Sequence, residues 1–346
     1  MTASRKLSSS ARARSRALAV TARIGQRIVG ALVMIFAVAS FTFFLVRLLP
    51  GDPLDAEYET LIERGLAPDQ AEAQVHRMYG FVPHDSLWNQ YVSYLTQLLH
   101  LDLGQSISYQ GIPVVRLISL AAPYTITLVL SGIVVSFLIG VVGGVVAAVR
   151  RNTRVGNALT ISGTVLHGIP QFVLALLLAF LFTTLWPLFP FGSPYDASIE
   201  PGFSLDFIAS LVSHAVLPVT AYALSSYGGW LLVMKSSVIS VLGDDFILAA
   251  ELRGLRQPTI MRYIGRNAML PLFTIFAISI GFMFGGSIFI ENIFNYPGLG
   301  NLLLSSVGHR DYPLMSGAFL LISAAVIVAN IAADLLYTII DPRVRT

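Results

Sequence analysis

The sequence contains no cysteine and few charged residues. The lack of cysteine excludes disulfide frameworks, thiolate zinc clusters and cysteine nucleophiles. Charged residues make up 12% of the 346-residue chain, about half of the share in an average soluble domain. Hydrophobic residues reach 55%. This balance indicates a polytopic membrane protein, and the formal net charge of +3 is too small to suggest a nucleic-acid-binding protein.

Six segments are long and apolar enough to cross a bilayer, which takes roughly 20 mostly apolar residues. We therefore expect an all-α polytopic membrane protein with six transmembrane helices. The predicted spans are Ile28–Leu49, Tyr124–Val149, Ala158–Leu185, Ile208–Met234, Ala268–Ile290 and Leu314–Ile340.

Positive charge gathers on one side of this predicted bundle. Of the 22 Lys and Arg residues, 17 lie before the first span, after the second, between the fourth and fifth, or after the last. The opposite loops are acidic, and the loop between spans three and four has no Lys or Arg. Because short cytoplasmic loops retain positive charge, both termini are expected in the cytoplasm.

The chain is expected to begin with a basic cytoplasmic tail (1–27) and the first span (28–49). The region 50–116 follows as the largest predicted extracytoplasmic segment, and a transmembrane domain (117–346) completes the chain. It contains the helix-like stretches Asp55–Glu63 and Pro68–Tyr79, followed by an aromatic patch from Trp88 to Tyr94. We expect this region to be folded.

The N-terminus has an alternative interpretation as a cleaved signal peptide. Its basic start and the triplet Ala37-Val38-Ala39 fit that pattern. The apolar run continues through Phe41–Val46, past the would-be cleavage site. This continuation favours an uncleaved first span.

Ionisable residues are nearly absent from the predicted spans. Arg47 and Asp334 lie near span ends, whereas His167 and His214 lie deeper. Ion-coupled carriers place ionisable groups within the bilayer, and a lone histidine there more often packs than relays protons. The pattern therefore disfavours proton or sodium coupling.

Helix breakers and small residues interrupt the spans. Gly168-Ile169-Pro170 falls in span three, Pro218 in span four and Gly281–Gly286 in span five. Plain helix packing is one interpretation, because glycines such as Gly140 and Gly144 permit close backbone approach. The other is that broken helices line a water-filled path, whose candidate residues are His167, Gln171, Ser225, Ser226, Tyr227, Met283 and Ser287.

The chain lacks the lysine motif of a P-loop. That motif needs Gly-Lys followed by Ser or Thr, so that the lysine reaches the β and γ phosphates. The two lysines are Lys6, which follows Arg5, and Lys235, which follows Met234. The chain cannot hydrolyse ATP by this route, so ATP-derived power must come from a partner.

The segment Asp244–Leu255 reads DDFILAAELRGL and lies between predicted spans four and five. Asp244 and Asp245 suit a helix N-terminus, and Gly254 suits a left-handed C-cap. Small side chains let another surface approach, and basic groups surround the helix. We predict a short cytosolic helix with a docking face that includes Ala249, Ala250, Arg253 and Arg256.

Several motifs together resemble the permease subunits of ABC importers, and specifically the first permease of the dipeptide/oligopeptide branch. The family has Glu-Ala-Ala followed four residues later by glycine; this chain has Leu248-Ala249-Ala250 and Gly254, with leucine replacing the glutamate. Further similar stretches are Arg47–Pro53, Leu101–Ser106, Leu270-Pro271, Glu291–Gly300 and Leu335–Arg343.

The resemblance implies a division of labour among several proteins in a bacterial cytoplasmic (inner) membrane. An extracytoplasmic solute-binding protein would deliver a peptide, and this chain with a second homologous permease would form the path through the lipid. Two cytosolic ATP-binding subunits would carry ATP and magnesium. This chain would be a translocating subunit without catalytic residues, cofactor or metal of its own.

The resemblance also assigns residues. The segment 244–254 would be the coupling helix that docks on an ATPase through Asp245, Leu248, Ala249, Ala250, Arg253, Gly254 and Arg256. At the outer mouth, Glu291 and Asn292 are expected to contact the solute or the delivery protein. The glycines of Tyr296–Gly300 are interpreted as a structural corner, since they suit tight turns.

Three alternatives remain at this point. The same machinery could import nickel chelates, glutathione or oligosaccharides. An ion-coupled secondary carrier would need intramembrane charges and inverted repeats, neither of which is clear in the sequence. A membrane scaffold that moves nothing would not need glycine-broken spans around a docking loop.

Overall fold

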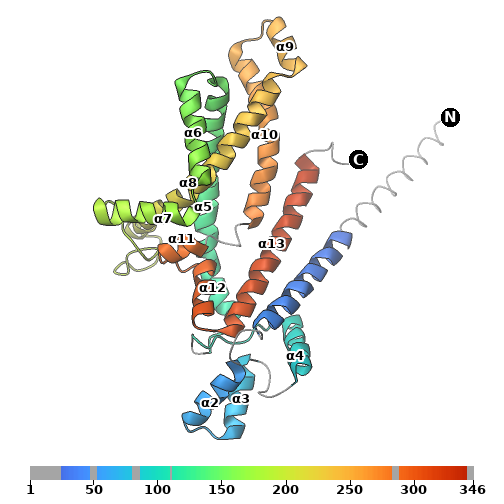
Figure 1. Cartoon of the computed structure of the whole chain (residues 1–346), viewed down its shortest axis with the longest axis vertical. Helices are drawn as coiled ribbons and strands as arrows, with labels where there is room; N and C mark the ends of the chain where they lie inside the picture. The colour runs from blue at the N-terminus through green and yellow to red at the C-terminus, as the bar shows by residue number, and fades with distance from the viewer. Residues whose placement is uncertain (1–24, 47–52, 80–85, 110, 283–287, 341–346) are drawn as a thin grey trace, which may run out of the picture.

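The computed structural model describes residues 25–46, 53–79, 86–109, 111–282 and 288–340 (Figure 1). The regular elements within these ranges are helices, beginning with Gly25–Val46. The others are α2 (Pro53–Glu63), α3 (Pro68–Tyr79), α4 (Leu87–Leu99), α5 (Val114–Val149), α6 (Arg154–Gly168), α7 (Gln171–Ala179), the π-helix η1 (Phe180–Leu185), α8 (Leu205–Leu242), α9 (Asp245–Leu252), α10 (Gln257–Phe282), α11 (Ile288–Ile293), α12 (Leu299–Gly308) and α13 (Tyr312–Ile340).

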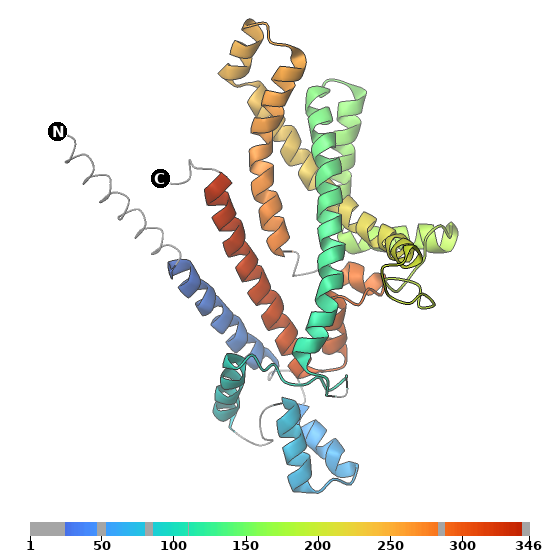
Figure 2. The ribbon, with the colours of Figure 1, turned by 180° about the vertical axis from the view of Figure 1, so that it is seen from behind.

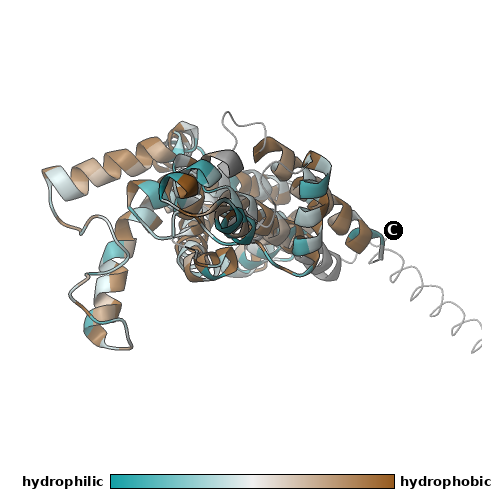
Figure 3. Ribbon diagram, turned by 90° about the horizontal axis from the view of Figure 1, so that it is seen from below, coloured by the Kyte–Doolittle hydropathy of each residue, from teal (hydrophilic) through white to brown (hydrophobic). Residues whose placement is uncertain are grey.

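Five helices in the described ranges are long and apolar enough to cross a membrane. They are Gly25–Val46, Val114–Val149, Leu205–Leu242, Gln257–Ile280 and Tyr312–Ile331. Figure 3 shows long hydrophobic (brown) stretches in the helices, with hydrophilic (teal) residues between them. The expected all-α polytopic membrane architecture is confirmed, whereas the side of the membrane on which each terminus lies remains a prediction.

The third predicted span is not a straight helix. It consists of α6 and α7 with η1, which are bent by 100° relative to each other. Ile169 is extended, with φ −83° and ψ 127°, as expected for a residue before proline. Pro170 then starts α7. The break foreseen at Gly168-Ile169-Pro170 therefore turns the chain sharply.

One sequence expectation about helix breaks was wrong. Pro218 does not interrupt span four, because α8 continues through it, and Pro218 and Leu217 are buried. Proline is tolerated in membrane helices where neighbouring groups compensate for the freed carbonyl. The helix α10, which holds most of the predicted span five, begins before that span, at Gln257, and its Ile260, Ile264 and Ala268 recur at helical spacing and are all buried.

The most extensive contact between two described helices joins α5 and α8 (Figure 2). A Cβ atom added to Gly144 would lie 2.6 Å from the Cβ atom of Met234 and 2.7 Å from the carbonyl oxygen of Leu231. Gly140 meets Trp230 with similar closeness. Both glycines therefore serve close helix packing, and the packing interpretation is confirmed for this pair.

The helices α2 and α3 correspond to the helix-like stretches expected after the first span. Their residues Leu61 and Val75 are buried in one cluster with Val114 of α5 and Leu314 of α13. Figure 1 shows α2 and α3 at one end of the molecule and α9 at the other. The long helices therefore separate the α2–α3 pair from α9.

Asp311 ties the loop after α4 to the start of α13. Its fully buried carboxylate accepts hydrogen bonds from the Ser106 hydroxyl, from the Ser108 N–H at 3.0 Å and from the Leu314 N–H at 3.2 Å. Ser106 belongs to the Leu101–Ser106 motif. This motif thus has a structural use at the base of α13.

Candidate functional site

The helix α9 ends in a glycine-dependent cap at one end of the molecule. Gly254 has φ +67°, the left-handed conformation expected from the sequence. Its N–H donates to the Glu251 carbonyl at 2.9 Å, and the Leu255 N–H donates to the Ala250 carbonyl at 3.2 Å. This pair of bonds is a Schellman motif, which stops the helix and turns the chain toward α10.

One face of α9 packs on the protein itself. Ile247 and Ala250 are buried in a cluster with Met234 and Val238 of α8 and Ile264 of α10. Their spacing of three residues places both side chains on the same side of the helix. The expectation that Ala250 belongs to a docking face is therefore wrong, because Ala250 anchors α9 to α8 and α10.

The opposite face of α9 is exposed and largely apolar. Leu248 is 56% exposed and Leu252 is 81% exposed; Asp245 and Ala249 are also exposed. Sequence reasoning missed Leu252, although the spacing 245, 248, 249 and 252 is helical and could have indicated it. Large apolar side chains in this position suit a protein partner.

Charged groups border this face. Arg253 and Arg256 are exposed, as is Glu251. Asp244 is the N-cap residue, but its side chain makes no capping hydrogen bond. The negative charge expected at the helix start is present in Asp245, in the first turn, where it complements the helix dipole.

The bend between α6 and α7 brings together polar residues expected along a path. The Gln171 amide donates a hydrogen bond of 3.2 Å to the Ser225 hydroxyl of α8. Ser225 in turn donates to the Tyr222 carbonyl at 2.8 Å. Both Gln171 and Ser225 are only half-buried, so this polar pair beside the bend is partly exposed.

His167 lies at the close crossing of α6 and α8. Its ring is within 3.5 Å of the position that a Cβ atom on Gly229 would take. Gly228 packs directly on the Gly163 backbone and on His167, leaving no room for a side chain. His167 itself remains exposed on α6, beside Gly228 and Gly229 of α8, which lie one turn from Ser225.

The other residues expected along the path differ in burial and in position. Ser226 is half-buried on α8. Tyr227 is buried, and its hydroxyl oxygen lies 3.3 Å from the position of a Cβ atom on Gly143 of α5. The placement of Tyr227 on a path is therefore wrong, since it fills the α5–α8 contact. Met283 and Ser287 lie outside the described residues.

Glu291 is fully buried, which contradicts its expected role in contacting solute or a delivery protein. Its carboxylate accepts hydrogen bonds from the Thr125 hydroxyl at 2.8 Å, the Gly300 N–H at 2.7 Å and the Asn301 N–H at 3.1 Å. Burial raises the pKa of Glu291, and these three hydrogen bonds oppose the shift. The carboxylate holds a helix end rather than a ligand.

The Tyr296–Gly300 stretch is the structural corner that the sequence indicated. The Thr125 hydroxyl accepts a hydrogen bond from the Leu299 N–H at 2.7 Å. Together with Glu291 it satisfies the free N–H groups at the start of α12. A side chain at Gly298 would collide with both. Asn292 is exposed and remains a candidate for an outer contact.

Two hollows flank this corner. One, of about 400 Å³, is lined by Tyr124, Tyr195, Glu200 and Pro297, and the other, of about 450 Å³, by Tyr124, Pro297 and Asn301 among others. The Tyr124 and Tyr296 rings meet edge to face at 6.3 Å. Among the described residues, no three His, Asp or Glu side chains are grouped to hold a metal ion.

Comparison with known proteins agrees with the motifs. The family described as "Binding-protein-dependent transport system inner membrane component" matches residues 140–346. A protein of Brucella suis biovar 1 named for peptide permeation is 34% identical over 90% of this chain and 95% of its own length. The dipeptide transport system permease protein DppB of Escherichia coli (strain K12) is 32% identical over 88% of this chain and 93% of the relative.

A relative named for another cargo is the nickel import system permease protein NikB of Staphylococcus aureus (strain USA300). It is 28% identical over 92% of this chain and 90% of the relative. The family match covers more than half of the chain, and the relatives align along nearly its full length. The chain therefore belongs to the family of binding-protein-dependent transport system inner membrane components.

Proposed function

We propose that this chain is the translocating subunit of an ATP-driven peptide importer. The observation that carries the proposal is the exposed Leu248–Leu252 face of α9, a helix capped by Gly254 at one end of a membrane bundle. In a family named for binding-protein-dependent transport, an apolar face outside the membrane suits docking of an ATPase subunit. The chain itself supplies no P-loop lysine.

The membrane orientation follows from charge. The segment with α9 also contains Lys235, Arg253, Arg256, Arg262 and Arg266. Positive residues in short loops mark the cytoplasmic side. On this basis α9 and both termini lie in the cytoplasm of a bacterium, and α2 and α3 lie outside the inner membrane, where a solute-binding protein would dock.

The path is proposed to run beside the bend between α6 and α7. Gln171, Ser225 and His167 give this place amide, hydroxyl and imidazole groups, and these can bind a polar peptide backbone without a fixed charge. A second, homologous permease would close the other side. Closure of the two ATPase subunits would move α9 of each permease. The path would then open alternately to the outside and to the cytoplasm.

Peptides are the favoured solute because the Brucella suis and Escherichia coli relatives are named for peptide and dipeptide transport. Nickel chelates are the second candidate, favoured by the Staphylococcus aureus relative. Competition separates them: excess dipeptide should abolish uptake of a labelled dipeptide by the intact system, and excess nickel chelate should not. The reverse pattern would assign the second candidate.

The partner composition is tested by purification of the full-length chain in a mild detergent with mass spectrometry of the bound proteins. We expect a second permease with several apolar spans and proteins containing P-loops. Recovery of this chain alone, together with solute movement without ATP, would contradict the proposal and favour a secondary carrier.

A further inference from the structure

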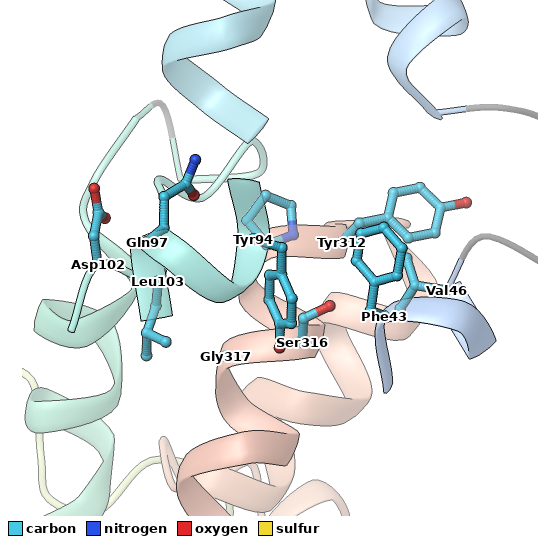
Figure 4. A pocket seen from close by; sticks show the side chains of 10 residues that line it. Phe43, Val46, Tyr94, Gln97, Asp102, Leu103, Tyr312, Ser316 and Gly317 are labelled. Atoms are coloured by element: carbon cyan, nitrogen blue, oxygen red, sulfur yellow. The ribbon is translucent and has the colours of Figure 1, made fainter. Parts of the chain in front are cut away.

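Two adjoining cavities lie between the Gly25–Val46 helix, α4 and α13. The smaller one, of about 50 Å³, has the polar side chains of Tyr94, Gln97, Asp102 and Ser316 among a larger number of apolar and aromatic ones; we call it the polar cavity (Figure 4). The larger one, of about 610 Å³, is lined by apolar side chains only; we call it the apolar cavity. Leu103 lines both cavities, so the two cavities are direct neighbours.

The two cavities lie at different depths along the same helices. The polar cavity is lined by Val46 and Tyr312, at the ends of their helices, and the apolar cavity by Ile35 and Leu321. At 1.5 Å per residue, these positions are about 14 to 16 Å apart along the helices. This distance is about half of the 30 Å hydrocarbon core, which is comparable with the depth of one leaflet.

Some large apolar side chains of α4 are exposed, and others line the apolar cavity. Trp88 is 69% exposed and Leu99 is 84% exposed, whereas Gln90 and Tyr91 are buried. The Tyr91 hydroxyl shares a hydrogen bond of 2.6 Å with the Ser40 hydroxyl of the first helix. Exposed apolar side chains of this size, beside a helix long and apolar enough to cross a membrane, suit contact with lipid. We therefore place α4 within the lipid beside the first helix.

The polar cavity offers groups for a headgroup. Within the described residues, the buried Tyr94 hydroxyl has no hydrogen-bond partner. Figure 4 shows the polar ends of Gln97 and Asp102 on one side of the cavity, while Leu103 points the opposite way. One carboxylate oxygen of Asp102 accepts from the Gly104 N–H at 2.9 Å. The carboxylate complements a cationic group.

We propose that the two cavities together bind one phospholipid, with an acyl chain in the apolar cavity and an ammonium headgroup beside Asp102. The charged Asp102 lies beside the polar cavity, and the apolar cavity lies next to it. This order of charged, polar and apolar groups matches the chemistry of a phospholipid. The anionic carboxylate would disfavour phosphatidylglycerol relative to phosphatidylethanolamine. The site lies apart from α9 and from the bend between α6 and α7, and it does not depend on which solute is transported.

The test is native mass spectrometry of the full-length chain with its bound partners, after removal of lipid and addition of dioleoyl phosphatidylethanolamine or dioleoyl phosphatidylglycerol. We expect one retained phosphatidylethanolamine per chain and less retained phosphatidylglycerol. Ala324→Trp would fill the apolar cavity and should abolish retention. The matched control Val328→Trp, at a 61% exposed position outside the cavity, should not.

A second variant tests the headgroup without disturbing the packing. Asp102→Asn should keep the retained lipid but lose the preference for phosphatidylethanolamine. Equal retention by Ala324→Trp and Val328→Trp would overturn the proposal, because the lipid would then be general annular lipid. Retention without any preference in the native chain would overturn the assignment of the headgroup to Asp102.

Discussion

The Thr125 hydroxyl donates a hydrogen bond of 2.8 Å to the Glu291 carboxylate across 166 positions of sequence. Both side chains are fully buried, and together they accept hydrogen bonds from three consecutive N–H groups, those of Leu299, Gly300 and Asn301. This network joins α5, α11 and α12 at a point where a helix end would otherwise bury unpaired donors.

Removal of this carboxylate should destabilise the chain. Glu291→Ala leaves two backbone N–H groups and the Thr125 hydroxyl without their acceptor, and each buried unpaired group costs about 1–3 kcal/mol. We expect a lower midpoint of thermal unfolding in detergent, followed by tryptophan fluorescence. Asn292→Ala, at the exposed neighbouring position, is the control. Equal midpoints for the two variants would show that Glu291 does not hold the helix end.

The conformation of Gly254 provides a test of coupling. Gly254→Val places a β-branched side chain on a backbone in the left-handed conformation. This costs about 1–2 kcal/mol and disturbs the end of α9. We expect ATP hydrolysis by the assembled transporter to continue with reduced solute uptake. Gly243→Ala is the matched control, since Gly243 has a negative φ and an added Cβ atom would meet only an ordinary contact at 3.4 Å. Unchanged uptake per ATP in the valine variant would remove Gly254 from the coupling mechanism.

The exposed leucines of α9 should hold the ATPase subunits. Leu252→Asp removes an apolar side chain whose full burial is worth about 1.5–3 kcal/mol and places a charge in the interface. We expect a loss of co-purifying ATPase of tenfold or more, read by quantitative mass spectrometry. Gln257→Asp, at an exposed position beyond the cap, introduces the same charge as a control. Undiminished ATPase recovery with Leu252→Asp would place the docking surface elsewhere.

The natural absence of cysteine allows direct mapping of the proposed path. Gln171→Cys and Ser225→Cys should react with a small, charged thiol reagent, and bound peptide should slow the reaction. Ser136→Cys should remain unreactive, because Ser136 is fully buried and accepts a hydrogen bond from the Trp230 indole. Equal labelling of all three positions, or no protection by peptide, would contradict a path at the bend.

The sequence predicted the parts of the fold that depend on composition and local chemistry. Apolar length located the spanning helices, Ile169-Pro170 located the bend, and Gly254 located the end of α9. Contacts distant in sequence were not accessible in this way. Thr125 carried no local sign of its bond to Glu291, and Ala250 was assigned to the wrong face because α8 and α10 decide which side of α9 is buried.

The most direct measurement is uptake of a labelled dipeptide into proteoliposomes that contain the co-purified complex and its solute-binding protein. We predict that the dipeptide accumulates only when ATP is supplied to the ATPase subunits. This accumulation should be lost with Leu252→Asp but not with Gln257→Asp. Dipeptide movement that is independent of ATP and insensitive to Leu252→Asp would contradict the importer function.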